Sequence, residues 1–215
     1  MFIEALPEGT RRNLALLGSA GLAEPFHLAG GTAAALHLGH RVSIDLDFFG
    51  PVSFDTRQLA AQLADLGQFR LDRLAPDTLL GELNDVKISF FRYSYSLISE
   101  PASVLGVKIA SLRDIAAMKL DAIATRGTRR DFIDLYFIAR SGLTLPETLQ
   151  CYQQKFIGLN LNVVHVVKSL AYFADAETDP MPWMLVKVSW NDVKRFFEGE
   201  ARALLKTIWS QGEQS

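Results

Sequence analysis

The residues best suited to chemistry lie within residues 26–50, FHLAGGTAAALHLGHRVSIDLDFFG. A glycine pair, Gly30 and Gly31, follows a short apolar run, and two carboxylates, Asp45 and Asp47, follow after a spacer of helix length. Paired carboxylate oxygens are hard ligands that suit Mg²⁺. Backbone N–H groups of a glycine turn at a helix start favour a phosphate. A phosphate cradle beside a metal site is what phosphoryl or nucleotidyl transfer requires.

The pattern around these residues predicts a strand at 26–29, a tight turn, a short helix at 32–38 and a strand at 41–48. Alternate side chains of a strand share a face. We therefore expect one face to carry Arg41, Ser43, Asp45 and Asp47, and the other to carry Val42, Ile44, Leu46 and Phe48. Taken singly, an Asp-x-Asp is commonly a solvated strand face and a Gly-Gly a turn. It is their combination that favours a site.

The same residues resemble a known superfamily. Gly-Gly-Thr at 30–32, followed by Arg-x-Ser-x-Asp-Leu-Asp-Phe-Phe at 41–49, is similar to the nucleotidyltransferases, and more narrowly to the AbiEii/AbiGii toxin-type family. Thirteen residues lie between Gly31 and Asp45, close to the dozen of the family signature. The resemblance implies a minimal nucleotidyltransferase fold of the α+β class. Its small mixed sheet would be flanked by helices and followed by a helical C-terminal part.

Further elements follow from the pattern. Helices are predicted at 7–23 and 55–66, and strands at 69–74 and 86–93. We expect a nucleotidyltransferase core at 1–106 and a helical part at 107–215 that completes the cleft.

One position departs from the family. Relatives often carry a third carboxylate on a strand after the Asp-x-Asp, and the corresponding run here, Val-Lys-Ile-Ser-Phe-Phe, has Ser89 at that place. The nearest acid is Asp85, at the start of the strand. The departure puts two-metal chemistry in doubt or moves the third ligand elsewhere. It supports an alternative, a non-catalytic relative that binds nucleotide or a protein partner.

A second group of polar residues lies on two predicted helices. Ser111 and Thr128 have the spacing of helix N-caps, and Lys119 falls on an otherwise apolar stripe. From the pattern alone, we favour for Lys119 a lysine whose stem covers apolar surface. The alternative is a lysine directed at a phosphate. Asp131 lies three residues after Thr128, so the pattern favours it as the acidic residue of a capping box that begins at Thr128.

The resemblance assigns these residues a role. Met-Lys-Leu-Asp-Ala at 118–122, with Arg126, and Arg-Arg-Asp-Phe-Ile-Asp-Leu-Tyr at 129–136 are similar to a second conserved block of the family. The lysine of that block is assigned to nucleotide phosphates, and an Arg-Asp pair completes the site. Carried over, these are Lys119, Asp131 and, more weakly, Arg130. Asp134 could pair with Arg130 instead.

Composition sets limits on location and partners. The net charge of −2 argues against bulk electrostatic binding of nucleic acid. Residues 43–85 are mainly acidic and 108–140 mainly basic, which suits a nucleotide held between them. Cys151 is the single cysteine, and neither a signal peptide nor a membrane span is indicated. We therefore expect a cytoplasmic protein without membrane partners.

The last third is predicted to be helical at 148–157, 163–173 and 190–205, with a loop at 174–180. The resemblance implies a Mg²⁺-dependent transfer of a nucleoside monophosphate from an NTP to a hydroxyl of tRNA or a protein. It also implies a toxin with a cognate antitoxin. An alternative is a phosphotransferase that moves the γ-phosphate, which would need the same metal and phosphate sites. The expected catalytic residues are Asp45, Asp47, Lys119 and Asp131, with Asp45 and Asp47 as metal ligands. The expected nucleotide-binding residues are Gly30, Gly31, Thr32, Arg41, Ser43, Lys119 and Arg130.

Overall fold

The computed structural model describes residues 1–212 and contains two compact units. The first is Met1–Ile115 and the second begins at Ala116, so that the boundary falls inside helix α4, Leu112–Thr125. The expected functional division between 1–106 and 107–215 stays a prediction. Within residues 1–212, none of the helices combines the length and the apolar character that crossing a membrane requires.

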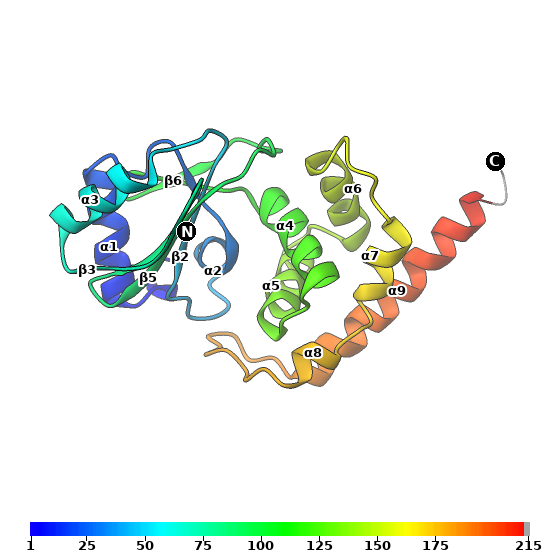
Figure 1. Ribbon diagram of the computed structural model, residues 1–215. Coiled ribbons are helices and arrows are strands. Elements are labelled where there is room, and N and C mark those ends of the chain that lie inside the picture. Colours follow the sequence, from blue (N-terminus) through cyan, green and yellow to red (C-terminus); the bar gives the residue numbers. More distant parts are fainter. Residues whose placement is uncertain (213–215) are drawn as a thin grey trace. The chain divides into compact units, whose positions relative to one another are not determined.

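The first unit is a mixed sheet with helices (Figure 1). Its strands are β1 His27–Leu28, β2 Leu46–Gly50, β3 Phe69–Ala75, β4 Thr78–Leu83, β5 Val86–Arg92, β6 Ala102–Val104 and β7 Val107–Ile109. Its helices are η1 Ile3–Ala5, α1 Glu8–Ser19, α2 Gly30–Leu38 and α3 Thr56–Leu66. The strand order is β3-β4-β5-β2-β1-β7-β6. β2 runs parallel to β5 and β1 parallel to β7, and the other pairs are antiparallel. The expected α+β class, with a mixed sheet, flanking helices and a helical C-terminal part, is confirmed.

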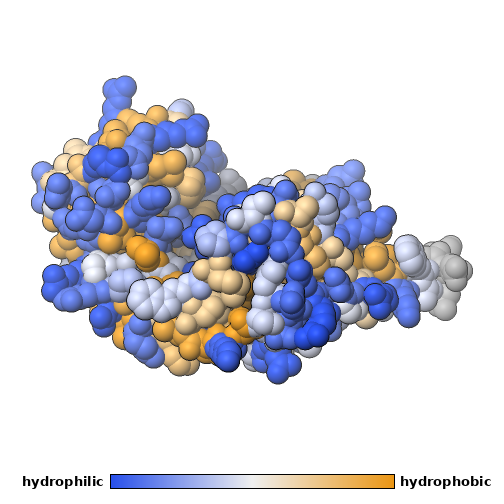
Figure 2. All heavy atoms as spheres, turned by 90° about the horizontal axis from the view of Figure 1, so that it is seen from below, coloured by the Kyte–Doolittle hydropathy of each residue, from blue (hydrophilic) through white to orange (hydrophobic). Residues whose placement is uncertain are grey.

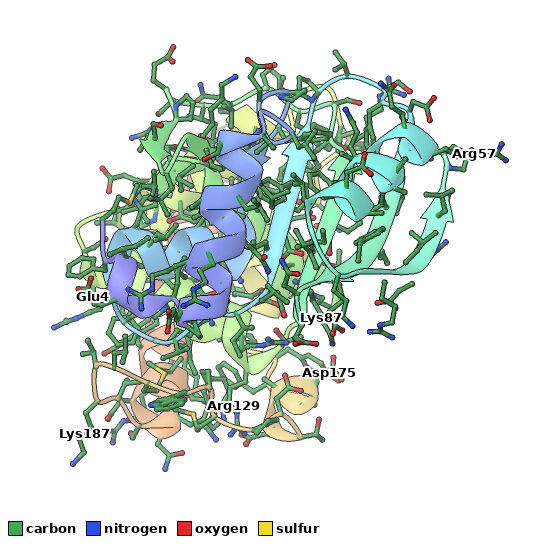
Figure 3. The ribbon with its side chains drawn as sticks, turned by 90° about the vertical axis from the view of Figure 1, so that its left-hand side faces the viewer. Glu4, Arg57, Lys87, Arg129, Asp175 and Lys187 are labelled. Atoms are coloured by element: carbon green, nitrogen blue, oxygen red, sulfur yellow. The ribbon has the colours of Figure 1, made fainter. Side chains whose placement is uncertain are left out.

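The two faces of this sheet differ. α1 and α3 lie on the same face, as Figures 1 and 3 show from two directions. Along β2 and β5 the side chains alternate, and Phe48 and Phe90 are fully buried with their rings stacked 4.8 Å apart. Asp47, Phe49, Ser89 and Phe91, on the alternate positions, are only partly buried. The apolar core therefore lies on one face, and the second face presents polar and aromatic groups.

Three strands that the pattern did not indicate, β4, β6 and β7, complete the sheet. β4 forms hairpins with β3 and β5, and the second hairpin turns at Asn84 and Asp85, both with positive φ. Asn and Asp tolerate this conformation, which two-residue hairpin turns favour. Asp85 is exposed in that turn, so it serves the hairpin. The connector expected at 93–106 contains β6 and leads into β7.

The strand predicted at 41–48 is shorter than expected. Residues 42–45 precede β2 without strand pairing, and Ile44, expected on the apolar face, is 53% exposed. Their backbone groups bond elsewhere, because the Ser43 N–H donates to the Ala5 carbonyl and Thr10 donates to the Ile44 carbonyl at 3.0 Å. Since these groups bond to η1 and α1, no ladder forms, and strict alternation begins only at Leu46.

The second unit is helical. It contains most of α4, then α5 Arg129–Arg140, α6 Leu145–Lys155, α7 Val163–Ser169, α8 Ala174–Glu177 and α9 Trp190–Gly212. The predicted helices are present with shifted ends, and the loop expected at 174–180 begins as the short α8. Phe132 and Phe197 are fully buried and pack α5 on α9, with ring centroids 5.4 Å apart. Exposed apolar side chains gather in one segment between α8 and α9, and they are Met181, Trp183, Leu185 and Val186. Figure 2 shows hydrophobic areas between hydrophilic side chains on one face of the molecule.

Candidate active site

The glycine turn contacts the start of β2. Gly30 begins α2 with φ +66°, a conformation that L side chains rarely adopt. A Cβ placed on Gly30 would lie 3.3 Å from Asp47 Oδ2. The Ala29 N–H donates to the Asp47 carbonyl at 3.0 Å. Glycine therefore allows the first turn of a helix, where N–H groups lack intrahelical partners, to approach a carboxylate closely.

Three more of the expected residues pack against this turn. A Cβ on Gly31 would lie 2.3 Å from an Arg41 guanidinium nitrogen. The Thr32 hydroxyl donates to Ser43 Oγ at 2.8 Å and also contacts the Asp45 carbonyl. Arg41 is 3% exposed and donates to the Val42 carbonyl at 3.1 Å. The structure thus brings Gly31, Thr32, Arg41 and Ser43 together. Thr32 and Ser43 are engaged with each other, and hold residues 41–45 against α2.

The Asp-x-Asp pair lies at the entry to β2. Asp45 immediately precedes the strand and Asp47 is its second residue, with buried Leu46 between them. Across residues 1–212, no group of three or more His, Cys, Asp or Glu side chains is arranged to hold a metal ion. Two carboxylates nevertheless fit Mg²⁺, because Mg²⁺ commonly takes one or two protein carboxylates and completes its shell with substrate phosphates and water.

Ser89 stands directly beside Asp47. The parallel pairing of β2 and β5 sets Asp47 opposite Ser89, and Phe49 opposite Phe91. Since opposite residues of paired strands share a face, Ser89 occupies the place where an acid would add a third carboxylate to the pair. A hydroxyl there leaves that position without negative charge.

Lys119 is the centre of the second cluster, on α4 and α5 in the second unit. Its ammonium lies 2.8 Å from Asp131 Oδ1 and 2.7 Å from Asp134 Oδ2. The three residues are 6%, 1% and 0% exposed. Lys119 is therefore buried and paired, and its stem does not cover surface in the way the helical stripe alone favoured.

Asp131 is held by three side chains. Besides Lys119, the Thr128 hydroxyl donates to Oδ2 at 2.6 Å, and Arg126 Nε donates to the same oxygen at 3.2 Å. Burial by itself raises the pKa of Asp131, but the charges of Lys119 and Arg126 outweigh it and lower the pKa to about 2. A carboxylate that remains ionised so far below neutrality is a weak base, so the geometry suits Asp131 to positioning Lys119.

The arginines of this region differ in their contacts. Arg129 donates to the Ala176 and Glu177 carbonyls at 3.0 Å and lies over the Trp190 ring, so it anchors α8 to α5. Arg130 is exposed on α5. Asp134 and Arg126, which carried little weight in the sequence, contact the Lys119–Asp131 pair directly. The available signal for Asp134 was its spacing, since residues three apart share a helix face.

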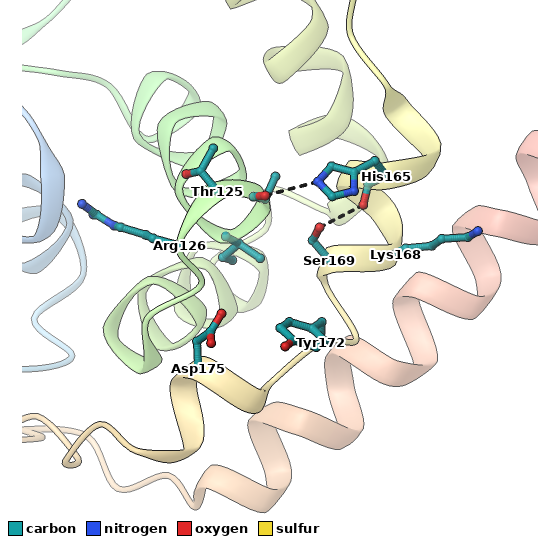
Figure 4. A pocket seen from close by; sticks show the side chains of 9 residues that line it. Thr125, Arg126, His165, Lys168, Ser169, Tyr172 and Asp175 are labelled. Carbon is teal, nitrogen blue, oxygen red and sulfur yellow. Dashed lines mark hydrogen bonds between the residues drawn. The ribbon is translucent and has the colours of Figure 1, made fainter.

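A cavity of about 430 Å³ lies beside this cluster, between α4, α7 and α8 (Figure 4). Its lining consists of Ile123, Ala124, Thr125, Arg126, His165, Lys168, Ser169, Tyr172 and Asp175. The Arg126 and Lys168 side chains extend away from it in opposite directions, whereas Asp175 and Tyr172 lie near each other at its edge. His165 bonds to the Ala124 carbonyl at 3.3 Å, which ties α7 to α4.

The fold is that of the nucleotidyltransferases. The chain superposes on a Helicobacter pylori structure reported as a "putative nucleotidyltransferase", with a TM-score of 0.57 and 18% identity. The match covers 95% of this chain and 98% of the other. JHP933 from Helicobacter pylori gives a TM-score of 0.53 and 19% identity over 97% of both chains. At such identities the likeness concerns the fold.

The family follows from the sequence comparison. The model of the family described as "Nucleotidyl transferase AbiEii toxin, Type IV TA system" matches residues 14–103 and 85–211. The chain belongs to this family of toxin-type nucleotidyltransferases. It is also 36% identical over 206 residues to the uncharacterized protein aq_aa25 of Aquifex aeolicus strain VF5, covering 94% of this chain and 98% of the relative.

Proposed function

We propose that this chain transfers a nucleoside monophosphate from an NTP to a hydroxyl group, with release of pyrophosphate. The acceptor is tRNA or a protein, and the chain acts as the toxin that a cognate antitoxin restrains. Membership of the AbiEii family supports the reaction class. The close approach of Gly30 to Asp47 is the observation in this chain that supports the proposal, because a helix start is suited to phosphate and a neighbouring carboxylate is suited to Mg²⁺.

In this proposal Asp45 and Asp47 hold Mg²⁺, which neutralises charge on the triphosphate when bound. The backbone of Gly30, Gly31 and Thr32 binds phosphate at the start of α2. Arg41, whose guanidinium lies against Gly31, supplies positive charge to the same turn. Ser43 supports the turn through Thr32.

Lys119 contributes the second positive group. Asp131 and Asp134 both contact its ammonium. Its proposed role is to neutralise a phosphate as a point charge, and Arg130 gives a weaker, exposed contact.

The proposed location is the cytoplasm. The single cysteine, Cys151, is free and buried, which fits a reducing compartment, and an NTP is the proposed substrate.

A second function is favoured by one observation, the serine opposite Asp47. Without a third carboxylate the chain would bind a nucleotide and transfer it poorly. Transfer of the γ-phosphate is a further alternative, because it would use the same metal and phosphate sites. The position of the label that reaches the acceptor separates these reactions.

The test is a transfer assay with Mg²⁺, total tRNA, total cell protein and each NTP labelled at the α- or the γ-phosphate. Asp45→Asn is the site variant, and Asp65→Asn, an exposed carboxylate of α3, is the matched control. We expect α-label in RNA or protein with the parent chain and with Asp65→Asn, and none with Asp45→Asn. Transfer of γ-label alone would make the chain a phosphotransferase. Mg²⁺-dependent NTP binding without transfer would favour the hypothesis that the chain binds nucleotide but does not catalyse.

A further inference from the structure

Four aromatic side chains lie next to Asp47 on the partly exposed face of the sheet. Phe49 and Phe91 are opposite residues of β2 and β5, with stacked ring centroids 5.4 Å apart. Tyr93 packs edge-on against Phe49 at 5.4 Å, and Tyr95 packs against Tyr93 at 5.0 Å. We call Phe49, Phe91, Tyr93 and Tyr95 the aromatic platform.

The register fixes where the platform lies relative to the proposed metal ligands. Phe49 is two residues beyond Asp47 on the same strand, and Phe91 two residues beyond Ser89. With a rise of about 3.3 Å per residue, the rings begin about 7 Å along the face from the Asp47–Ser89 pair. The Tyr93 N–H donates to the Gly50 carbonyl at 2.7 Å, which continues the parallel pairing past the end of β5.

The platform differs from the aromatic core on the other face. Phe48 and Phe90 are fully buried beneath helices, whereas the four platform rings are only partly buried. These partly exposed rings leave aromatic surface next to the proposed phosphate and metal site. Flat rings of this kind bind nucleobases of any sequence, because every base has a π-face.

From this arrangement we propose that the aromatic platform stacks a nucleobase whose nucleotide reacts at Asp47. The inference rests on the proposed nucleotidyl transfer and adds a binding subsite to it. One ribose separates the reacting phosphate of an NTP from its base, and one ribose likewise separates a terminal 3′-hydroxyl from its base. The shared chemistry is therefore a nucleobase, supplied by the NTP or by the end of an acceptor RNA.

The experiment compares the binding of three probes to the full chain with Mg²⁺ present. They are inorganic tripolyphosphate, α,β-methylene-ATP and a short single-stranded oligoribonucleotide. The variants are Phe91→Leu, which keeps an apolar side chain without the π-face, and Phe91→Tyr, which keeps the ring. Thermal unfolding of each variant checks that the fold is retained.

We expect Phe91→Leu to weaken a base-bearing probe about tenfold and to leave tripolyphosphate unchanged, with Phe91→Tyr close to the parent. Weakening of the ATP analogue alone assigns the platform to the incoming nucleotide, and weakening of the oligonucleotide alone assigns it to the acceptor. Unchanged binding of both in Phe91→Leu overturns the proposal, as does a parent chain that binds neither. The transfer reaction is judged separately, by α-label and Asp45→Asn.

Discussion

Asp47 and Ser89 lie opposite each other in the parallel pair β2–β5. The pair lies on the same face as the aromatic platform, and its Asp47 carboxylate is the one that the glycine turn approaches. Its consequence for metal binding can be measured directly.

Placing a carboxylate at this position is expected to strengthen Mg²⁺ binding at the proposed site. Ser89→Asp adds a charged oxygen ligand beside Asp47, so we expect Mg²⁺ to bind on the order of tenfold more tightly. Without metal, the two like charges repel and the variant unfolds at a lower temperature than the parent. Thermal unfolding across a Mg²⁺ titration measures both effects. Ser103→Asp, at an exposed position of β6, is the control. Equal Mg²⁺ dependence in both variants would argue against metal binding at Asp47.

A side chain at Gly30 is expected to destabilise the first unit. Gly30→Ala introduces a Cβ at positive φ and at 3.3 Å from Asp47 Oδ2, so we expect a loss of about 1–2 kcal/mol in the free energy of unfolding. Urea unfolding provides the value. Gly9→Ala, in α1 where a Cβ makes ordinary contact with Val86 at 3.7 Å, should be neutral or stabilising. A similar loss for both variants would mean that the glycine turn has no special requirement.

Removing the Lys119 charge is expected to deprive two buried carboxylates, Asp131 and Asp134, of the ammonium that both contact. We predict that Lys119→Met lowers the free energy of unfolding by about 3–5 kcal/mol, because breaking a buried ion pair on one side strands the remaining charge. Arg130→Met, on the exposed face of α5, should change it by no more than about 0.5 kcal/mol. Denaturant unfolding at neutral pH distinguishes them. A loss below 1 kcal/mol for Lys119→Met would contradict the buried pairing.

The low pKa of Asp131 has a defined pH signature. A group whose pKa falls from 3.8 to about 2 on folding contributes stability that is present above the unfolded value and is lost as pH falls through the folded one. This lowering of the Asp131 pKa corresponds to about 2–3 kcal/mol of stability. Compared with Asp131→Asn, the parent should therefore keep this advantage down to about pH 4 and lose it between about pH 4 and pH 2. Urea unfolding of both chains at a series of pH values measures the difference. A difference that stays constant over this range would refute the assignment.

Local signals in the sequence determined much of the fold. Asp55 accepts from the Arg57 and Gln58 N–H groups and begins α3, as its position before an apolar stripe predicts. Gly39 ends α2 in the left-handed conformation that glycine adopts freely. Thr128 caps α5 through the Asp131 N–H. These features depend on neighbours within one helical turn, and short-range patterns report such neighbours well.

Only the tertiary structure decided the details of the two clusters. Residues 42–45 carry a strand pattern, yet η1, α1 and α2 bind their backbone and side chains, so the ladder starts at Leu46. Lys119 reads as a surface lysine in its own helix, and it is Asp131 and Asp134 of the next helix that bury and pair it. Strand register places Ser89 beside Asp47, a residue 42 positions earlier in the chain. Such partners are distant in sequence, and packing alone determines which of them meet.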